Sequence, residues 1–551
     1  MGPTEIAICC AHVRLSKPSS DVDSHAFFLL ILALGVGSVC RYWRVNPALP
    51  LIAAGLAFDW FVPSVIQELP DPEFILTLVL APLVFAAALA SSAVDLRRFR
   101  RSVLLLAVVL VTITTVVVGV VASATLAALT LASACALGAI LAPTDAVAAA
   151  AVAAKTGLPS RVQLVIEGES LANDGTALTI LRVATVAAVT GSVTVLSSTK
   201  ILVLAVVGGI LVGALGGWLI SLLIRLAREP IVGNAILLLT PFVVYEASEK
   251  IGGSGLLSVV ICGVWIAHTT SVRGNYRLRL QADSVWGLIT FILECFAFVL
   301  VGAEFFDTYN RVQEPGWAAL VVLAVALTLL ITVVRFLFMG VWFLVGPKVA
   351  PERFADRRGM AKEFIAIGLL GVRGPISVLA AFSVPEVIDT GAPFPGRDLI
   401  LCVTFAVVIV SLLFSFLAGP FIRRLHLNSR TDVEALQAAR LATAKAALRR
   451  FDELVAQADA DGRPLDASLV EVMRAQTANR VAALKSGPDV NDARTDFIAS
   501  REEIRQSMLE AERDELVRLR SDKQVSGEAF KDLTKELDMR EQAIGSTGGS
   551  H

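Results

Sequence analysis

The sequence predicts an all-α polytopic membrane protein that ends in a polar helical extension. Hydrophobic residues make up 55% of the chain and the mean hydropathy is +0.71, both higher than in soluble globular proteins. Apolar segments about 20 residues long, enough to cross a bilayer, recur as far as residue 425 and then stop. We therefore divide the chain into an extracytoplasmic leader (1–25), a membrane domain (26–425) and a cytoplasmic helical tail (426–551).

Thirteen apolar segments are long enough to span a membrane. They lie at 26–40, 47–66, 74–92, 103–128, 131–154, 161–191, 200–225, 231–249, 255–270, 285–306, 316–346, 361–384 and 398–421. No charged residue separates the fourth segment from the fifth. Merging these two, however, would put the basic loops out of phase with the spans, so the charges favour thirteen.

Basic residues orient the spans. Alternate connections carry Arg41, Arg44, Arg97, Arg98, Arg100, Arg101, Lys155, Arg161, Arg225, Arg228, Arg273, Arg277, Arg279, Lys348, Arg353, Arg357, Arg358 and Lys362. The connections between them offer only Lys200, Lys250, Arg311 and Arg397. Cytoplasmic loops hold the excess of Lys and Arg. The N-terminus is therefore expected outside and the C-terminus in the cytoplasm.

Two spans contain a proline break beside an ionisable residue. The fifth has APTD (142–145) and the twelfth has GVRGP (371–375). They are seven spans apart, an odd offset, so one is inverted relative to the other. A single proline often only kinks a membrane helix. A matched pair instead favours two inverted repeats whose broken helices cross at an ion-binding site, as in secondary transporters.

The sixth span carries polar groups where packing alone does not explain them. Glu167, Glu169, Asn173 and Asp174 lie within eight residues of an otherwise apolar segment. An ionisable residue inside a membrane helix costs about 2.5–3.5 kcal/mol on insertion scales and usually marks an ion or proton path. The cluster therefore indicates a transport site.

Helical spacing sorts these polar groups into two faces. Ser170 and Asp174 are four residues apart, as are Glu169 and Asn173, so each pair shares a face. We expect Asp174 to point toward the break at Pro143 and Glu169 to face a neighbouring helix. A buried carboxylate without a partner is stable when it holds either a proton or a small cation, which is the chemistry of exchange.

Three motifs carry a resemblance to a known family. APTDAVAAAAVA (142–153), EGESLANDGTAL (167–178) and GVRGPIS (371–377) resemble the electroneutral branch of the monovalent cation:proton antiporters, the bacterial sodium/proton exchangers. The resemblance covers residues 26–425. It implies thirteen spans, a core domain that moves against a dimerisation domain, a homodimer in the cell membrane, and exchange of Na⁺ (or Li⁺, K⁺) for H⁺ without ATP or a cofactor.

The resemblance also implies roles for individual residues. Asp174 would be the carboxylate shared by the cation and the proton. Asp145, the backbone at Thr144, and Ser170 would complete the ion site, so that the cation lies at Asp174, Asp145 and Ser170.

Further implied roles concern the neighbours of that site. Asn173 stands where the electrogenic branch has a second acid, which implies one cation exchanged for one proton. Glu169 and Arg373 would form a buried structural ion pair. Arg335, in the eleventh span, would contact Asn173.

One position departs from the family pattern. Many relatives have an acid directly after the Phe of a P-x-x-F segment in the third span, and this chain has Ala86 there. The departure leaves the preference for Na⁺ or K⁺ open. Glu294 in the tenth span is another embedded acid, which would either compensate or serve as a structural hydrogen-bonded group. Glu167 is a second candidate for an accessory role.

Other functions are less well supported. A K⁺-preferring antiporter, a transporter of organic anions and a non-transporting receptor or scaffold on the same fold stay as alternatives; Ala86 is the hint for the last. No nucleophile–base set indicates an enzyme. The seven cysteines are scattered without a CxxC pair, which argues against a metal site. A net charge of −1 gives no reason to expect nucleic acid as a partner.

The polar tail predicts helices that pack on each other. Helical periodicity is visible over 432–457 and again over 497–519, with a turn expected at Gly487-Pro488.

Overall fold

The fold is known from a computed structural model. It describes residues 20–43, 45–61, 72–145, 158–191, 195–227, 229–273, 276–312, 316–349, 357–427, 430–461 and 465–485, with a few isolated positions besides. Within these residues the chain is helical and has a single isolated β-bridge, between Val387 and Pro393. The chain divides into two compact units, residues 1–429 and 430–551.

The first unit contains a helix or a pair of helices at each of the thirteen predicted spans, which confirms the fold class. In chain order these are α1 (Ser20–Tyr42), α2 (Ala48–Phe61), α3 (Pro72–Ala90), η2 (Leu105–Leu110) with α5 (Val111–Thr125), α6 (Leu131–Leu141), α8 (Ser160–Thr190), α9 (Val195–Leu226), α10 (Pro230–Lys250), α11 (Gly255–Arg273), α12 (Tyr276–Ala303), α14 (Trp317–Val349), α15 (Arg357–Leu369) with α16 (Pro375–Phe382), and α17 (Arg397–Arg424).

Two helices lie outside the predicted spans. The amphipathic helix α4 (Ala93–Leu104) carries the four arginines of the second basic cluster, on either side of Phe99 in the sequence, and it continues through the π-helical turn η2 into α5. The short helix α13 (Phe305–Arg311) follows α12 after a break at Glu304. Helix α13 has too few residues and too many polar ones to give a hydropathy signal.

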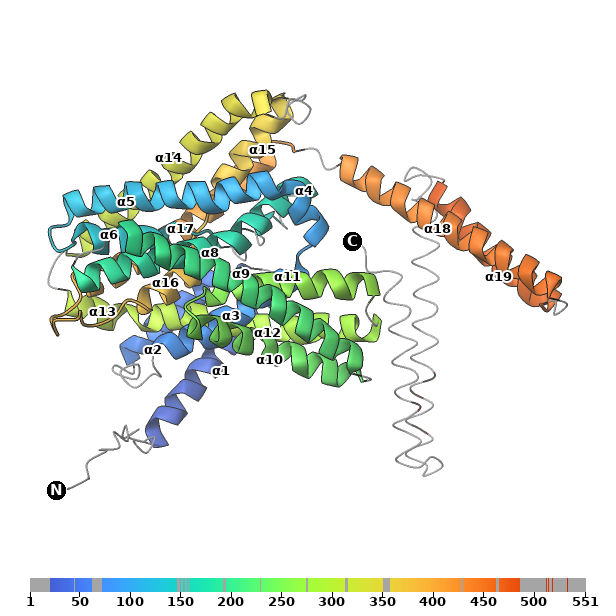
Figure 1. Ribbon diagram of the computed structural model, residues 1–551, viewed down its shortest axis with the longest axis horizontal. Coiled ribbons are helices and arrows are strands. Elements are labelled where there is room, and N and C mark those ends of the chain that lie inside the picture. The colour runs from blue at the N-terminus through green and yellow to red at the C-terminus, as the bar shows by residue number, and fades with distance from the viewer. Residues whose placement is uncertain are drawn as a thin grey trace, which may run out of the picture. The chain divides into compact units, whose positions relative to one another are not determined.

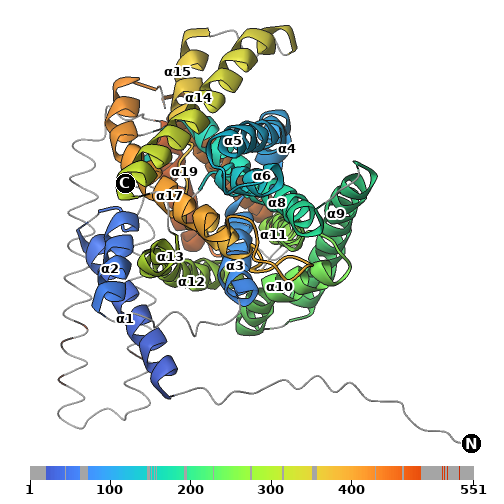
Figure 2. The ribbon, with the colours of Figure 1, turned by 90° about the vertical axis from the view of Figure 1, so that its left-hand side faces the viewer.

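Contacts sort the membrane helices into two groups. The first group contains α4, η2, α5, α6, α8 and α14 to α17, and the second contains α1 to α3 and α9 to α12; the short helix α13 contacts both groups, and α17 most of all. Helices α5, α6 and α8 lie side by side in both views (Figures 1 and 2). The groups meet where α3 and α12 approach α16, and where α8 approaches α9 and α11. A cavity lies between the groups.

Glycines bring helix backbones into contact inside the second group. A Cβ atom added to Gly55 of α2 would overlap the backbone of α12, and one added to Gly302 of α12 would overlap the backbone of α2. Gly213 of α9 faces the backbone of α11 at Ser258 in the same manner, whereas Gly217 of α9 faces the side chain of Trp265. Small residues permit such close packing in membranes, where burial of apolar surface gives helices little reason to associate.

The second unit is a helical hairpin. Helices α18 (Arg430–Ala460) and α19 (Ala467–Lys485) lie side by side (Figure 1), and Arg474 Nη2 lies 2.8 Å from Asp452 Oδ1 across them. The predicted helix 432–457 lies within α18. Helix α19 was not predicted, and the expected turn at Gly487-Pro488 and most of 497–519 lie outside the described residues.

Candidate functional site

The two interrupted helices cross each other. Helix α6 ends at Leu141 and α15 ends at Leu369, and each is followed by a short non-helical segment. The backbone N–H of Asp145 donates to the carbonyl oxygen of Val372 at 2.8 Å, which joins the two segments. Irregular backbone at membrane depth is tolerated only inside protein or beside a cavity. The crossing therefore places freed backbone groups where both prolines predicted them.

Arg373 caps the broken helix α6. Its Nε donates to Leu141 O at 2.9 Å and its Nη2 to Ala142 O at 3.3 Å, while Nη1 donates to Gly371 O. Its backbone N–H donates to Ser411 Oγ of α17 at 2.9 Å. A cation at a helix C-terminus satisfies orphan carbonyls and interacts favourably with the helix dipole. Arg373 thus stabilises the crossing itself.

The buried ion pair forms with a different arginine from the one expected. Arg335 of α14 binds Glu169 through both guanidinium branches, with Nη2 2.7 Å from Oε2 and Nη1 against Oε1. The two side chains are only 3% and 2% exposed, and Arg335 Nε also donates to Ile367 O at 3.1 Å. The expected pair of Glu169 with Arg373 does not form, because the guanidinium of Arg373 is committed to carbonyl groups. Arg335 correspondingly contacts Glu169 and not Asn173.

The hydroxyl of Thr144 connects α8 to the broken helix. It accepts a hydrogen bond from Asn173 Nδ2 at 2.9 Å and lies 3.2 Å from Ser170 Oγ. It also donates to Glu169 Oε1 at 3.4 Å. The resemblance had assigned a role to the backbone of Thr144, and the side chain adds this link. These contacts of Thr144 therefore hold α8 at a fixed position along its axis relative to the crossing.

Two carboxylates complete the site. Asp174 and Asp145 are 5% and 3% exposed, and both line one cavity. Asp174 Oδ1 is buried and has no hydrogen-bond partner among the described residues. A Cβ atom added to Gly374 would overlap the side chain of Asp145. The second glycine of GVRGP is thus needed for Asp145 to reach the crossing, a requirement that the motif alone did not reveal.

The cavity has a volume of about 780 Å³ and lies between the two helix groups. Its walls come from α3, α8, α10, α11, α12 and α16. Ser170, Ala86 and Glu294 line it together with the two aspartates. Glu167 does not, and its carboxylate accepts a hydrogen bond from Gln163 instead, at 2.9 Å.

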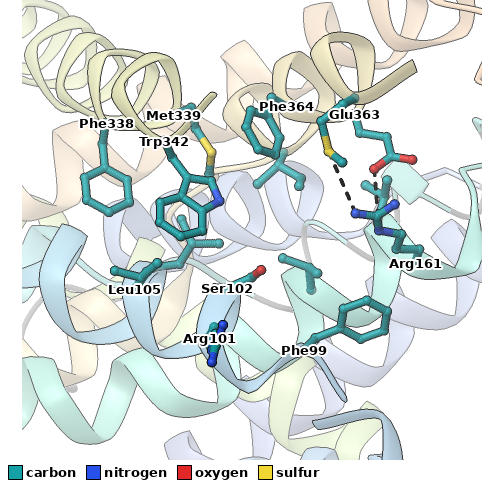
Figure 3. Close-up of a pocket in the computed structure, with 15 residues that line it drawn as sticks. Phe99, Arg101, Ser102, Leu105, Arg161, Phe338, Met339, Trp342, Glu363 and Phe364 are labelled. Carbon is teal, nitrogen blue, oxygen red and sulfur yellow. Dashed lines mark hydrogen bonds and ion pairs between the residues drawn. The ribbon is translucent and has the colours of Figure 1, made fainter. Parts of the chain in front are cut away.

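A second cavity, between α4, α8, α14 and α15, is of a different kind (Figure 3). Its volume is about 60 Å³, and aromatic side chains such as Phe338, Trp342 and Phe364 line it. At one end Arg161 forms an ion pair with Glu363 at 3.7 Å. None of the predicted site residues lines this cavity. The chemistry therefore belongs to the larger one.

Comparisons with known proteins agree with this geometry. Residues 27–424 match the family described as "Sodium/hydrogen exchanger, transmembrane". The chain belongs to this family. Because the family consists of transporters, the exchanger is not an enzyme, and it is a multi-pass membrane protein.

Several relatives carry names that state an activity. The exchanger is 30% identical over 406 residues to the "Sodium, potassium, lithium and rubidium/H(+) antiporter" of Bacillus pumilus, which covers 72% of this chain and 60% of the relative. The chain thus spans less than two thirds of that protein's length. It is 29% identical to an uncharacterized Na(+)/H(+) exchanger of Mycobacterium tuberculosis, over 93% of this chain and 94% of the relative. The relatives support cation/proton antiport.

A solved structure shows the same fold. The exchanger resembles the sodium proton antiporter MjNhaP1 from Methanocaldococcus jannaschii with a TM-score of 0.58 and 18% identity, over 74% of this chain and 98% of the other. At this level of identity the likeness concerns the fold.

Proposed function

We propose that this exchanger is a secondary active antiporter that carries Na⁺, or another alkali cation, in exchange for H⁺ by alternating access. Asp174 is the carboxylate that the two ions occupy in turn. The observation that carries the proposal is its buried Oδ1, which lacks a hydrogen-bond partner among the described residues and belongs to a side chain that lines a large cavity. An intramembrane acid of this kind marks an ion or proton path.

The groups around Asp174 suit a small hard cation. Asp145 lines the same cavity and supplies carboxylate oxygen, and Ser170 supplies a hydroxyl. Thr144 holds Ser170 in place through the 3.2 Å contact of their hydroxyls. Oxygen ligands of this type bind cations such as Na⁺. A proton on Asp174 removes the charge that holds the cation, so the two ions compete for one group.

The charges of the neighbours favour an exchange of one cation for one proton. Glu169 is neutralised by Arg335 at 2.7 Å, and Asn173 is an amide whose Nδ2 donates to Thr144. Neither group adds an exchangeable proton. Asp174 therefore binds one cation or one proton at a time.

Alternating access follows from the two helix groups. The cavity lies between them, and its exposed lining residues Asp283 and Gly287 lie toward the N-terminal end of α12, which follows the basic residue Arg273 in the chain. We expect the connection between α11 and α12 in the cytoplasm, so the structure corresponds to an inward-open state. Movement of the first group against the second would close this end and open the other. A homodimer, with the second group as the static partner surface, stays a prediction.

The cation range is a separate question. The Bacillus pumilus relative is named for sodium, potassium, lithium and rubidium, and Ala86 offers no oxygen to the cavity. A broad alkali-cation range, including a preference for K⁺, is therefore the second candidate.

Reconstituted vesicles test the proposal. With a pH-sensitive dye inside, added Na⁺, Li⁺ or K⁺ should produce a cation-dependent pH change, and Asp174→Asn should abolish it. Glu167→Gln is the matched control, because Glu167 is an acid of the same helix that does not line the cavity. Full exchange by Asp174→Asn would overturn the role of this carboxylate. Absence of exchange in the native chain would favour the non-transporting scaffold.

A further inference from the structure

One face of α12 forms a stripe along the cavity. Asp283, Gly287, Thr290, Glu294 and Phe298 are spaced four, three, four and four residues apart, which keeps them on one side of a helix. All five line the cavity. Asp283 and Gly287 are exposed, Thr290 and Glu294 are half-buried, and Phe298 is only 2% exposed. The stripe therefore runs from the mouth of the cavity to its floor.

Glu294 is a carboxylate without a structural task. It forms no hydrogen bond or ion pair with any residue that the structure describes. The lining residues of α3, α10, α11 and α16 carry no charge, so no cation faces it; the titratable lining groups are Asp145, Asp174, Asp283 and Glu294 itself. A carboxylate that served only packing would be paired or hydrogen-bonded at this depth. The structural alternative for Glu294 is thus disfavoured.

Thr290 offers an oxygen atom beside this carboxylate. Its hydroxyl donates to the carbonyl oxygen of Trp286 at 2.8 Å. Because the hydroxyl proton is used on the backbone, the lone pairs of Oγ1 stay available as acceptors. Thr290 precedes Glu294 by one helical turn on the same face. Together they present one charged and one neutral oxygen ligand to the cavity.

We propose that Glu294 and Thr290 form an entry site for a monovalent cation, on the path between the mouth of the cavity and Asp174. The proposal rests on the proposed function, since it concerns the route to the same carboxylate. The cation binds there with part of its hydration shell and is handed to Asp174 and Asp145, whose cavity Glu294 shares.

The part of the cavity wall that α3 forms carries no acid among the described residues. Ala86 lines the same cavity from α3. Glu294 supplies a carboxylate to the same space from α12. The cavity therefore holds a half-buried acid outside the pair formed by Asp174 and Asp145, in addition to the exposed Asp283 at its mouth.

The entry site affects cation capture and leaves the exchange chemistry to Asp174. Replacing Glu294 by Gln should raise the KM for Na⁺ roughly tenfold, as expected when one charge–charge contact in a partly hydrated site is lost. The maximal rate at saturating Na⁺ should change less than about threefold, because Asp174 is intact. Thr290→Val should raise KM in the same direction and less, since a neutral ligand is lost.

Moving the carboxylate across the cavity provides the decisive test. Exchange is measured in proteoliposomes over a range of Na⁺ concentrations for Glu294→Gln, for Ala86→Glu, and for the double variant. The proposal expects Ala86→Glu to restore a low KM in the Glu294→Gln background. Glu246→Gln is the control, because Glu246 is an acid of α10 that pairs with Lys250 outside the cavity.

The outcomes separate the two proposals. An unchanged KM in Glu294→Gln, or a high KM that Ala86→Glu does not lower, overturns the entry site. If Glu294→Gln does not fold, Thr290→Val and Glu294→Asp carry the test, and an unchanged KM in both overturns the site. Asp174→Asn reports on the proposed function independently. If Asp174→Asn loses exchange while Glu294→Gln keeps the native KM, the entry site is refuted and the proposed function is supported.

Discussion

The identity of the partner of Glu169 can be measured as a coupling free energy. Glu169 and Arg335 are 2% and 3% exposed and in bidentate contact, so replacing one of them leaves a buried charge alone. Glu169→Gln and Arg335→Met should each lower the free energy of unfolding by about 3–5 kcal/mol. Charge centres about 4 Å apart interact by about 4 kcal/mol at an effective dielectric constant of about 20. The double variant should therefore be more stable than the sum of the single effects, by about that amount.

Arg373 should behave differently from Arg335. Arg373→Met leaves the carbonyl groups of Leu141 and Ala142 without their donors, and each buried orphan costs about 1–3 kcal/mol. Arg373 donates no hydrogen bond to Glu169 among the described residues, so only the attraction between their charges through space couples them. Arg373→Met and Glu169→Gln should therefore couple less strongly than the two variants of the hydrogen-bonded pair do.

The assay is reversible unfolding of the purified exchanger in mild detergent, followed by tryptophan fluorescence as denaturant is added. Two double-mutant cycles are compared, one joining Glu169 to Arg335 and one joining Glu169 to Arg373. Additivity in the first cycle together with strong coupling in the second would refute the assignment. Arg182→Met serves as the control arginine, because its side chain is 39% exposed and its loss should cost far less.

Three further predictions follow from single contacts. Gly374→Ala should abolish exchange while helix content measured by circular dichroism is kept, because the new methyl group would overlap Asp145. Arg182→Glu should slow exchange by up to about fivefold, since a half-exposed ion pair is worth less than about 1 kcal/mol and this one, with Glu249, joins α8 to α10 across the two groups. The hydrogen bonds that Ser468 and Leu469 donate to Asp466 hold the pKa of that carboxyl below its usual range. The contribution of Asp466 to α19 is therefore present above the usual Asp pKa and is lost as the pH falls through the lowered one, which amide hydrogen exchange in α19 should report.

Each of these predictions has a control. Gly340→Ala matches the glycine variant, since nothing lies within 4 Å of a Cβ atom at Gly340, and normal exchange by Gly374→Ala would show that Asp145 need not lie where it does. The double variant Arg182→Glu with Glu249→Arg should regain part of the native rate, since Glu249 also accepts a hydrogen bond from the backbone N–H of Gly255; a rate no higher than that of Arg182→Glu would mean that the pair does not act through its charge. For α19, Asp466→Ala at neutral pH should lower the protection of the first amides of the helix, measured against the intrinsic exchange rate, as acid does; equal protection in native and variant chains would contradict a capping role.

Periodicity and length sufficed to predict the membrane helices. Hydropathy placed every span, and the two proline breaks predicted that non-helical segments would meet. Helical spacing also predicted that Ser170 and Asp174 share a face, and both line the cavity. These features depend on residues that are close together in the sequence, and they can therefore be predicted from it.

Contacts between distant residues were less predictable. Arg335 and Arg373 are both buried arginines, and the choice of partner for Glu169 depends on which guanidinium the carbonyls of α6 already hold. The spacer role of Gly374 appears only when Asp145 is in place beside it. Helix α19 was missed because its alternation of polar and apolar residues is weak, so packing on α18 must help to define it.

Arg373 has a consequence for ion traffic beyond its capping role. The oxygens of Leu141, Ala142 and Gly371 converge on its guanidinium, and converging carbonyl oxygens are what alkali ions use in place of water. The positively charged guanidinium occupies these three oxygens. They therefore do not form a binding site that competes with the cavity, and the transported ions bind only to the groups that line it.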